Sequence, residues 1–222
     1  MLVTAGAATV HAGSVGAPPP LALVPISSPP SNPAASADMP APVTAQVTAR
    51  TPAAAPAPVR RTAERLTRST PVRIEVPSIG VSSGLLALGL RPDGAMAVPP
   101  SGFPAGWFTG GPTPGELGPA VIVGHVDWAG RLGVFGRLRS LAPGAQVAVD
   151  RRDGTTAVFR VSRVVEVSKQ RFPTAAVYGN TDHAALRLIT CGGAFDHGVH
   201  SYQDNIVAFA DLESVRPTAS QR

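Results

Sequence analysis

The sequence predicts an all-β domain built as a barrel or a sandwich, and three observations lead to this prediction. From Pro71 onward, short apolar runs alternate with turn signals such as Asp153-Gly154. Several of these runs alternate apolar and polar residues with a period of two, as half-buried strands do. In this part of the chain a short helical or 3₁₀ pattern is confined to residues 134–142, just before Pro143-Gly144. We therefore expect seven or eight strands with little helix.

The strands are expected in the following order. "VRIEVPSIGV" alternates like a half-buried strand, and "RPDGAMAV" has an Asp-Gly turn that leads into a further strand. "GPAVIVGHVD" is a continuous apolar run, which predicts a strand buried on both faces. "QVAVDRRDGTTAVFRVSRVVEVS" predicts a hairpin around Asp153-Gly154 that continues into a long strand, and "ALRLITC" and "NIVAFADLE" complete the set.

A segment rich in alanine and proline precedes this domain. Residues 17–58 are mostly Pro, Ala, Ser, Val and Thr, with Asp38 and Arg50 as the only charges, so we expect residues 1–69 to be a disordered leader or linker. We expect a short basic helix near 60–68, a barrel domain over 70–214 and a flexible tail over 215–222. The first twenty residues are apolar but lack a basic beginning, which leaves open an export signal, an anchor remnant or a mis-set start.

Composition excludes several classes of site. A single cysteine among 222 residues excludes an intramolecular disulfide and a multi-cysteine zinc site. The net charge of +5 comes almost wholly from arginine, because Lys169 is the only lysine. The basic stretch "VRRTAERLTR" has no interleaved aromatic residues and lies outside the predicted domain, so we expect no nucleic-acid partner.

Two buried strands are predicted to end at reactive side chains. "PAVIVGHVD" delivers His125 and Asp127, and "LRLITC" delivers Cys191, which two glycines follow. An imidazole beside a thiol favours the thiolate and lowers its pKa from about 8.5. The same histidine can then protonate a leaving amine. The residues alone leave two interpretations open: a nucleophile with its acid–base partner, or a packed core cysteine and a structural histidine.

A family resemblance favours the first interpretation. "VIVGHVD", followed 66 residues later by "LRLITCGGAFD", resembles the sortases, in particular the class F-like group from actinobacteria. "PVRIEVPSIGV", "AGWFTGGPTPGELGPAVIVGHVD", "VFGRLRSLAPGAQVAV" and "YQDNIVAFA" resemble that group in order and spacing, over roughly residues 71–212. The resemblance implies an eight-stranded sortase-like β-barrel with short helices.

The resemblance also implies cysteine transpeptidation at the extracellular face of the cell membrane. Cys191 would attack the threonine carbonyl of an LPXTG-like sorting signal, and His125 would protonate the departing amine. An amine of the cell envelope, or water, would then resolve the thioester on Cys191. The implied partners are the sorting-signal peptide of a secreted protein and the envelope amine. The same resemblance implies proximity to the membrane and a reaction that needs no metal and no organic cofactor.

One feature departs from the family pattern. Sortases generally have an arginine on the strand after the cysteine, where it stabilises the substrate and the oxyanion. Here no arginine or lysine follows Cys191 until Arg216. Gln203 stands about where that arginine is expected, Asn205 lies two residues further along the strand, and Arg171 precedes the cysteine strand. We expect the missing donor among these three, with His197 and His200 as further substitutes.

Three further residues are candidates for supporting roles. Asp127 is placed either to orient His125 or a loop amide or to hold the loop structurally. Arg187 shares a strand face with Cys191, where packing and contact with substrate both stay open. Thr190 belongs to the cysteine motif itself. The missing arginine keeps open a catalytically weak or silent peptide-binding module of the same fold. A cysteine hydrolase that transfers the acyl group to water is a further alternative to a transpeptidase.

Overall fold

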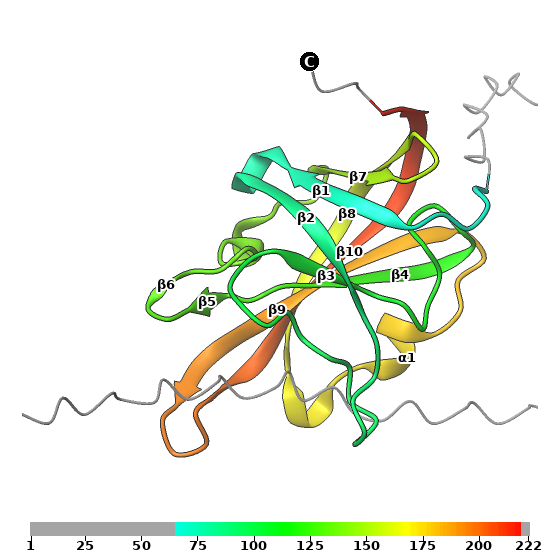
Figure 1. Ribbon diagram of the computed structural model, residues 1–222. Coiled ribbons are helices and arrows are strands. Elements are labelled where there is room, and N and C mark those ends of the chain that lie inside the picture. The colour runs from blue at the N-terminus through cyan, green and yellow to red at the C-terminus, as the bar shows by residue number, and fades with distance from the viewer. Residues whose placement is uncertain (1–64, 219–222) are drawn as a thin grey trace, which may run out of the picture.

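The computed structural model describes residues 65–218 and contains a closed barrel of eight strands (Figure 1). The barrel order is β1-β2-β3-β4-β9-β10-β8-β7, and β5 and β6 form a separate two-stranded hairpin. The strands are β1 Pro71–Val76, β2 Val81–Leu88, β3 Ala105–Phe108, β4 Gly118–Val123, β5 Asp127–Trp128, β6 Arg131–Leu132, β7 Gln146–Arg151, β8 Thr155–Ser168, β9 Ala184–Asp196 and β10 Ser201–Pro217. The helical elements are short: η1 Pro77–Ile79, η2 Leu138–Ser140, η3 Lys169–Arg171 and α1 Thr174–Tyr178.

Most neighbouring strands of the barrel are antiparallel, but two pairs are parallel. β2 pairs with β3, and β4 pairs with β9, in parallel registers. β10 is the longest strand and lies between β9 and β8, with both of which it is antiparallel. The β9–β10 hairpin projects beyond the barrel, as does the β5–β6 hairpin (Figure 1).

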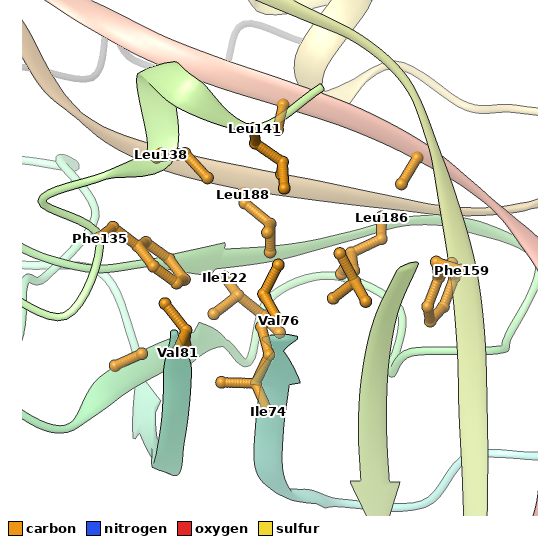
Figure 2. Packing of buried hydrophobic residues seen from close by; sticks show 14 of the residues in the cluster. Ile74, Val76, Val81, Ile122, Phe135, Leu138, Leu141, Phe159, Leu186 and Leu188 are labelled. Atoms are coloured by element: carbon orange, nitrogen blue, oxygen red, sulfur yellow. The ribbon is translucent and has the colours of Figure 1, made fainter. Parts of the chain in front are cut away.

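Alternate residues of the strands build two apolar clusters on opposite faces of the sheet. The inner cluster receives side chains from all eight strands and fills the barrel. Phe135 and Leu138 join it from the segment around η2 and lie near Leu188 and Ile122 (Figure 2). The outer cluster lies on β2, β3, β4, β9 and β10 and also includes Met96, Phe172 and Val177 from the segments between strands. Each fully buried side chain of this size contributes about 1.5–3 kcal/mol to the free energy of folding. Both faces of β4 are therefore buried, as its continuous apolar run predicts.

Several sequence predictions are confirmed by this fold. The described residues form a mostly β fold, the barrel has eight strands, and β7 and β8 form the hairpin at Asp153-Gly154, where Gly154 has a positive φ of 80°. The helical pattern of residues 134–142 corresponds to η2.

Other predictions were wrong in detail. The turn at Asp93-Gly94 forms, but it leads to an isolated bridge between Leu90 and Met96 and not to a strand. β2 and β3 were not predicted, because "VSSGLLAL" and "AGWF" lack a clear period of two. The cysteine strand does not end at Cys191 but continues to Asp196, because β10 pairs with it beyond the two glycines.

The edges of the domain also differ from the expected boundaries. Residues 65–70 have no regular secondary structure where a basic helix was expected, and residues 60–64 lie outside the described part of the chain. Leu66 packs on the inner cluster, and its amide donates to the Gly115 carbonyl. β10 continues to Pro217, past the expected boundary at 214. Between residues 65 and 218, no helix has the length and apolar character needed to cross a membrane.

Candidate active site

The parallel pairing of β4 with β9 brings His125 and Cys191 to the same level of the sheet. The register runs from Gly118 opposite Ala184 to Val123 opposite Ile189, and the Gly124 amide extends it by donating to the Ile189 carbonyl at 3.1 Å. Cys191 follows His125 by the same number of residues as Ala184 follows Gly118 and Ile189 follows Val123, so the two side chains continue this register. Two segments far apart in sequence thus deliver an imidazole and a thiol to adjacent positions.

Both side chains line one pocket with a volume of about 50 Å³. Its walls come from the connection between β4 and β5, from β9 and from the beginning of β10. The lining residues are His125, Val126, Asp127, Cys191, Phe195, His200, Ser201 and Tyr202. A pocket that contains a thiol, an imidazole, a carboxylate and an aromatic wall has the groups needed for nucleophilic and acid–base chemistry.

The orientation of the His125 ring is set by two contacts. Its Nε2 lies 2.8 Å from the carbonyl oxygen of Pro99, and its ring is tilted against Trp128 with centroids 4.9 Å apart. Because a carbonyl oxygen only accepts, Nε2 carries the hydrogen and donates. Nδ1 is therefore the nitrogen of His125 that remains free to take up and release a proton.

The thiol of Cys191 is half-buried beside the outer apolar cluster. Burial raises the pKa of this thiol, Lys169 lowers it through its charge and a hydrogen bond, and the charge of Asp127 raises it. The net shift is upward from the usual value near 9. The thiol is therefore protonated at neutral pH in the free protein, and its activation depends on the charges around it.

Asp127 belongs to the wall of the pocket. The hydroxyl of Tyr202 donates to Asp127 Oδ2 at 2.7 Å. Within residues 65–218, the carboxylate of Asp127 therefore bonds to β10 and not to His125, which it was expected to orient. Tyr202 in turn packs edge-to-face against Phe195, with ring centroids 5.1 Å apart. Burial, together with the hydrogen bond and the charge of Asp127, raises the pKa of Tyr202 to about 12.

The three expected donors occupy different environments. Asn205 pairs directly with Cys191 across β10 and β9 but is fully buried, and neither polar atom of its amide has a hydrogen-bond partner within residues 65–218. Gln203 is exposed at a bulge of β10 between Tyr202 and Asp204. Arg171 is exposed in η3 and does not line the Cys191 pocket. The structure therefore brings only Asn205 next to Cys191, in a position closed to solvent.

The two other motif residues lie away from the pocket. Thr190 faces the barrel side of β9, opposite to Cys191, and is 1% exposed. Arg187 shares the face of Cys191 but is itself buried, and its guanidinium lies over the ring of Phe209 at 4.5 Å. Arg163 lies over the same ring at 3.9 Å, so Phe209 is stacked between two arginines. This position makes Arg187 part of the sheet packing.

Five residues at the site were not predicted from the sequence. Four of them line the pocket, namely Val126, Phe195, Ser201 and Tyr202. The fifth is Lys169, which donates to Ser201 Oγ at 2.8 Å and lowers the pKa of the Cys191 thiol. Lys169 had one available signal, since it is the only lysine of the chain. No cluster of three or more His, Cys, Asp or Glu side chains that could hold a metal ion occurs in the part of the chain that is described.

Together, the fold and the pocket define an eight-stranded barrel protein with a histidine just after β4 and a cysteine within the parallel neighbour strand β9. The chain belongs to the sortase family, because the family model for the sortase domain matches residues 74–213. This membership makes it, in broad class, a sortase-type transpeptidase. Sortases use sorting-signal peptides and amine nucleophiles, and they act at the cell envelope.

Solved structures of several sortases share the fold. Sortase A of Listeria monocytogenes is 17% identical with a TM-score of 0.52, over 69% of this chain and 93% of that one. Sortase A of Corynebacterium diphtheriae is 19% identical with a TM-score of 0.51, over 67% of this chain and 62% of that one. Sortase C-3 of Streptococcus pneumoniae is 14% identical with a TM-score of 0.52, over 68% of this chain and 66% of that one. No curated protein matches the chain.

Proposed function

We propose that this chain is a cysteine transpeptidase that cleaves an LPXTG-like sorting signal and transfers its acyl part to an amine of the cell envelope. The observation that carries the proposal is the shared pocket of Cys191 and His125, formed by parallel strand segments in a fixed register. Within the proposal, the enzyme belongs to the class F-like sortases of actinobacteria and works at the extracellular face of the membrane.

The proposed reaction begins with transfer of the Cys191 thiol proton to Nδ1 of His125. The sulfur then attacks the carbonyl carbon of the threonine, a C–S bond forms, and an electron pair moves to the carbonyl oxygen. Collapse of this oxyanion restores the C=O bond and breaks the C–N bond, and His125 gives its proton to the departing amine. An incoming amine attacks the resulting thioester, loses a proton to His125 and releases Cys191.

The environment of both groups supports these roles. The contact with Pro99 leaves Nδ1 of His125 as the proton-exchanging nitrogen. Cys191 is the only cysteine of the chain, so no second thiol competes with it. Burial raises the pKa of the Cys191 thiol, so the nucleophile is protonated in the free enzyme. A neighbouring base such as His125 must therefore take up its proton before it attacks.

The decisive experiment uses the purified chain and LPXTG-type peptides, with intact mass measured before and after mixing. We expect an adduct of the acyl fragment, which disappears in Cys191→Ala and falls sharply in His125→Gln. Adding an oligoglycine amine should convert the adduct into a ligated peptide. The proposal fails if Cys191→Ala processes the peptide as the parent protein does.

Two further outcomes correspond to the alternative functions. Release of the free acid, unchanged by added amine, would identify a hydrolase in place of a transferase. Peptide binding that persists in Cys191→Ala, with no adduct in the parent protein, would identify a silent binding module. Either result contradicts the proposed transfer reaction.

A further inference from the structure

We infer that Lys169 is the cationic group beside the Cys191 pocket, where it stabilises the thiolate and the oxyanion in place of the arginine that is missing from the beginning of β10. The inference rests on the proposed function, because it assigns a role within the same acyl-transfer chemistry. It also makes a claim about the thiol itself, which is measurable without any peptide substrate.

The backbone places Lys169 close to Cys191 through three adjacent strands. Val167, Asn205 and Cys191 form one cross-strand row of β8, β10 and β9, and Ser168, Asp204 and Gly192 form the next. Lys169 follows Ser168 directly, so its backbone lies just beyond the row that contains Gly192, the neighbour of Cys191.

The end of β8 fixes the backbone of Lys169. β8 ends at Ser168, whose hydroxyl accepts a hydrogen bond from the Gln170 amide at 3.3 Å and so starts η3 at Lys169. The backbone of Lys169 is therefore held between a paired strand and a capped 3₁₀ turn. This limits the directions in which its ammonium group can point.

The ammonium is anchored at the edge of the pocket. Lys169 Nζ donates to Ser201 Oγ at 2.8 Å, and Ser201 lines the Cys191 pocket. Ser201 and Lys169 also line a neighbouring cavity of about 410 Å³, together with Tyr202 and Gln203. An ammonium has several N–H donors and Ser201 uses one of them, so donors remain for the sulfur and for a carbonyl oxygen of the substrate.

The charges of the residues around the pocket disfavour a thiolate unless a cation such as Lys169 lies nearby. The titratable groups that line it with Cys191 are His125, Asp127, His200 and Tyr202. Asp127 raises the pKa of the thiol, whereas Lys169 lowers it by charge and by a hydrogen bond. None of the residues that line the pocket carries a permanent positive charge. Without Lys169 beside it, the negative charge that forms on sulfur or oxygen would face the Asp127 carboxylate alone.

The other candidate donors are less well placed. Asn205 is fully buried and cannot reach a peptide without a rearrangement of β10. Gln203 is exposed and uncharged, and Arg171 is exposed and lines neither the Cys191 pocket nor the neighbouring cavity. Lys169 is thus the basic residue that combines a positive charge with a hydrogen bond to the pocket.

Alkylation of the single cysteine tests the claim directly. The rate of iodoacetamide modification as a function of pH reports the pKa of Cys191, with no other thiol to interfere. In Lys169→Met we expect a higher thiol pKa, with about a tenfold slower alkylation at pH 7.5 for each pKa unit gained. Lys169→Arg should keep the parent profile, and Ser201→Ala should give an intermediate shift.

Acylation by an LPXTG-type peptide provides the second readout. Loss of an oxyanion donor typically lowers the rate by about a hundred- to a thousand-fold, which we expect in kcat/KM for Lys169→Met and not for Lys169→Arg. Arg152→Met removes a charge from an exposed hairpin position and serves as the matched control, with unchanged alkylation and acylation. Thermal melting of each variant confirms that it is folded.

The two readouts separate failure of this inference from failure of the proposed function. If the parent protein processes no peptide but Lys169→Met still raises the thiol pKa, the charge assignment to Lys169 holds and the transferase proposal fails. If Lys169→Met has the parent alkylation profile, the inference is overturned. A larger loss in Arg171→Met than in Lys169→Met would also overturn it and would assign the role to Arg171.

Discussion

The hydroxyl of Tyr202 donates a hydrogen bond to Asp127 Oδ2 at 2.7 Å and so joins β10 to the residues that follow His125. This contact holds the carboxylate on the wall of the pocket. The negative charge of Asp127 raises the pKa of the Cys191 thiol. The hydrogen bond from Tyr202 therefore fixes the position of a carboxylate that disfavours the thiolate. The wall is completed by Phe195, which packs edge-to-face on Tyr202.

Removing the charge of Asp127 should lower two pKa values. Burial and the Asp127 hydrogen bond raise the pKa of Tyr202 to about 12. In Asp127→Asn we expect it to move toward about 10, the usual value for tyrosine, as measured by the ultraviolet absorbance of the phenolate. Alkylation of Cys191 at neutral pH should become faster in the same variant. Tyr178, the only other tyrosine, is an internal control, because burial alone raises its pKa; an unshifted Tyr202 would mean that the contact is not formed.

Gly193 should be intolerant of any side chain. Its φ is +76°, and a Cβ there would lie 2.3 Å from Asp204 Oδ2. In Gly193→Ala we expect a loss of about 1–3 kcal/mol in the free energy of unfolding from backbone strain alone. The clash with Asp204 adds to this loss and should also change the alkylation rate of Cys191 nearby. Denaturant unfolding measures the first effect.

Gly94→Ala is the matched control for this prediction. Gly94 has a nearly identical φ of +78°, but nothing lies within 4 Å of the added Cβ. We expect only the strain component of the loss and an unchanged alkylation rate. Equal losses in the two variants would show that the Asp204 side chain moves away from the added Cβ without lowering the free energy of unfolding.

Arg151 should be the basic residue whose loss destabilises the domain most. Its side chain is 0% exposed, and its guanidinium donates to the Pro114 and Thr67 carbonyls and pairs with Asp153 at 2.9 Å. Arg151→Met leaves these acceptors without their donor, so we expect a loss of about 3 kcal/mol in the free energy of unfolding. Urea denaturation measures it. Arg152→Met, at the exposed neighbour, should change stability by less than about 0.5 kcal/mol, and equal effects of the two substitutions would contradict the prediction.

His183 should make stability depend on pH. The imidazole contacts Asp182 through Nδ1 at 2.7 Å and Asp211 through Nε2 at 3.0 Å, and these carboxylates raise its pKa despite partial burial. A raised pKa in the folded state contributes stability that is fully present below about pH 6.5 and is lost as pH rises through the folded pKa. The Tm difference between the parent protein and His183→Gln should therefore be largest near pH 5.5 and shrink toward pH 8.5. A difference that stays constant over this range would count against the ion pairs.

Much of the barrel was predictable because its strands are patterned locally. The alternation of "VRIEV", the apolar run of β4 and the Asp-Gly turn between β7 and β8 depend on nearby residues and on burial, so single segments indicate them. β2 and β3 escaped prediction because their strand character comes from pairing with each other, with Leu85 opposite Ala105, and such pairing leaves no period in the sequence. The extension of β9 to Asp196 has the same cause, since β10 imposes it.

The features of the candidate site also fall into two groups: those that local sequence predicts and those that depend on strand pairing. The sequence by itself determined the strand-rich class, the single available thiol and the two motifs that carry Cys191 and His125, because these are properties of residue type and local order. Only the tertiary structure decided that Asp127 contacts Tyr202, that Asn205 is closed off, and that Lys169 reaches the pocket through Ser201. Those relationships depend on the register of strands far apart along the chain, and the direction of a side chain across that register is not encoded by any short stretch of residues.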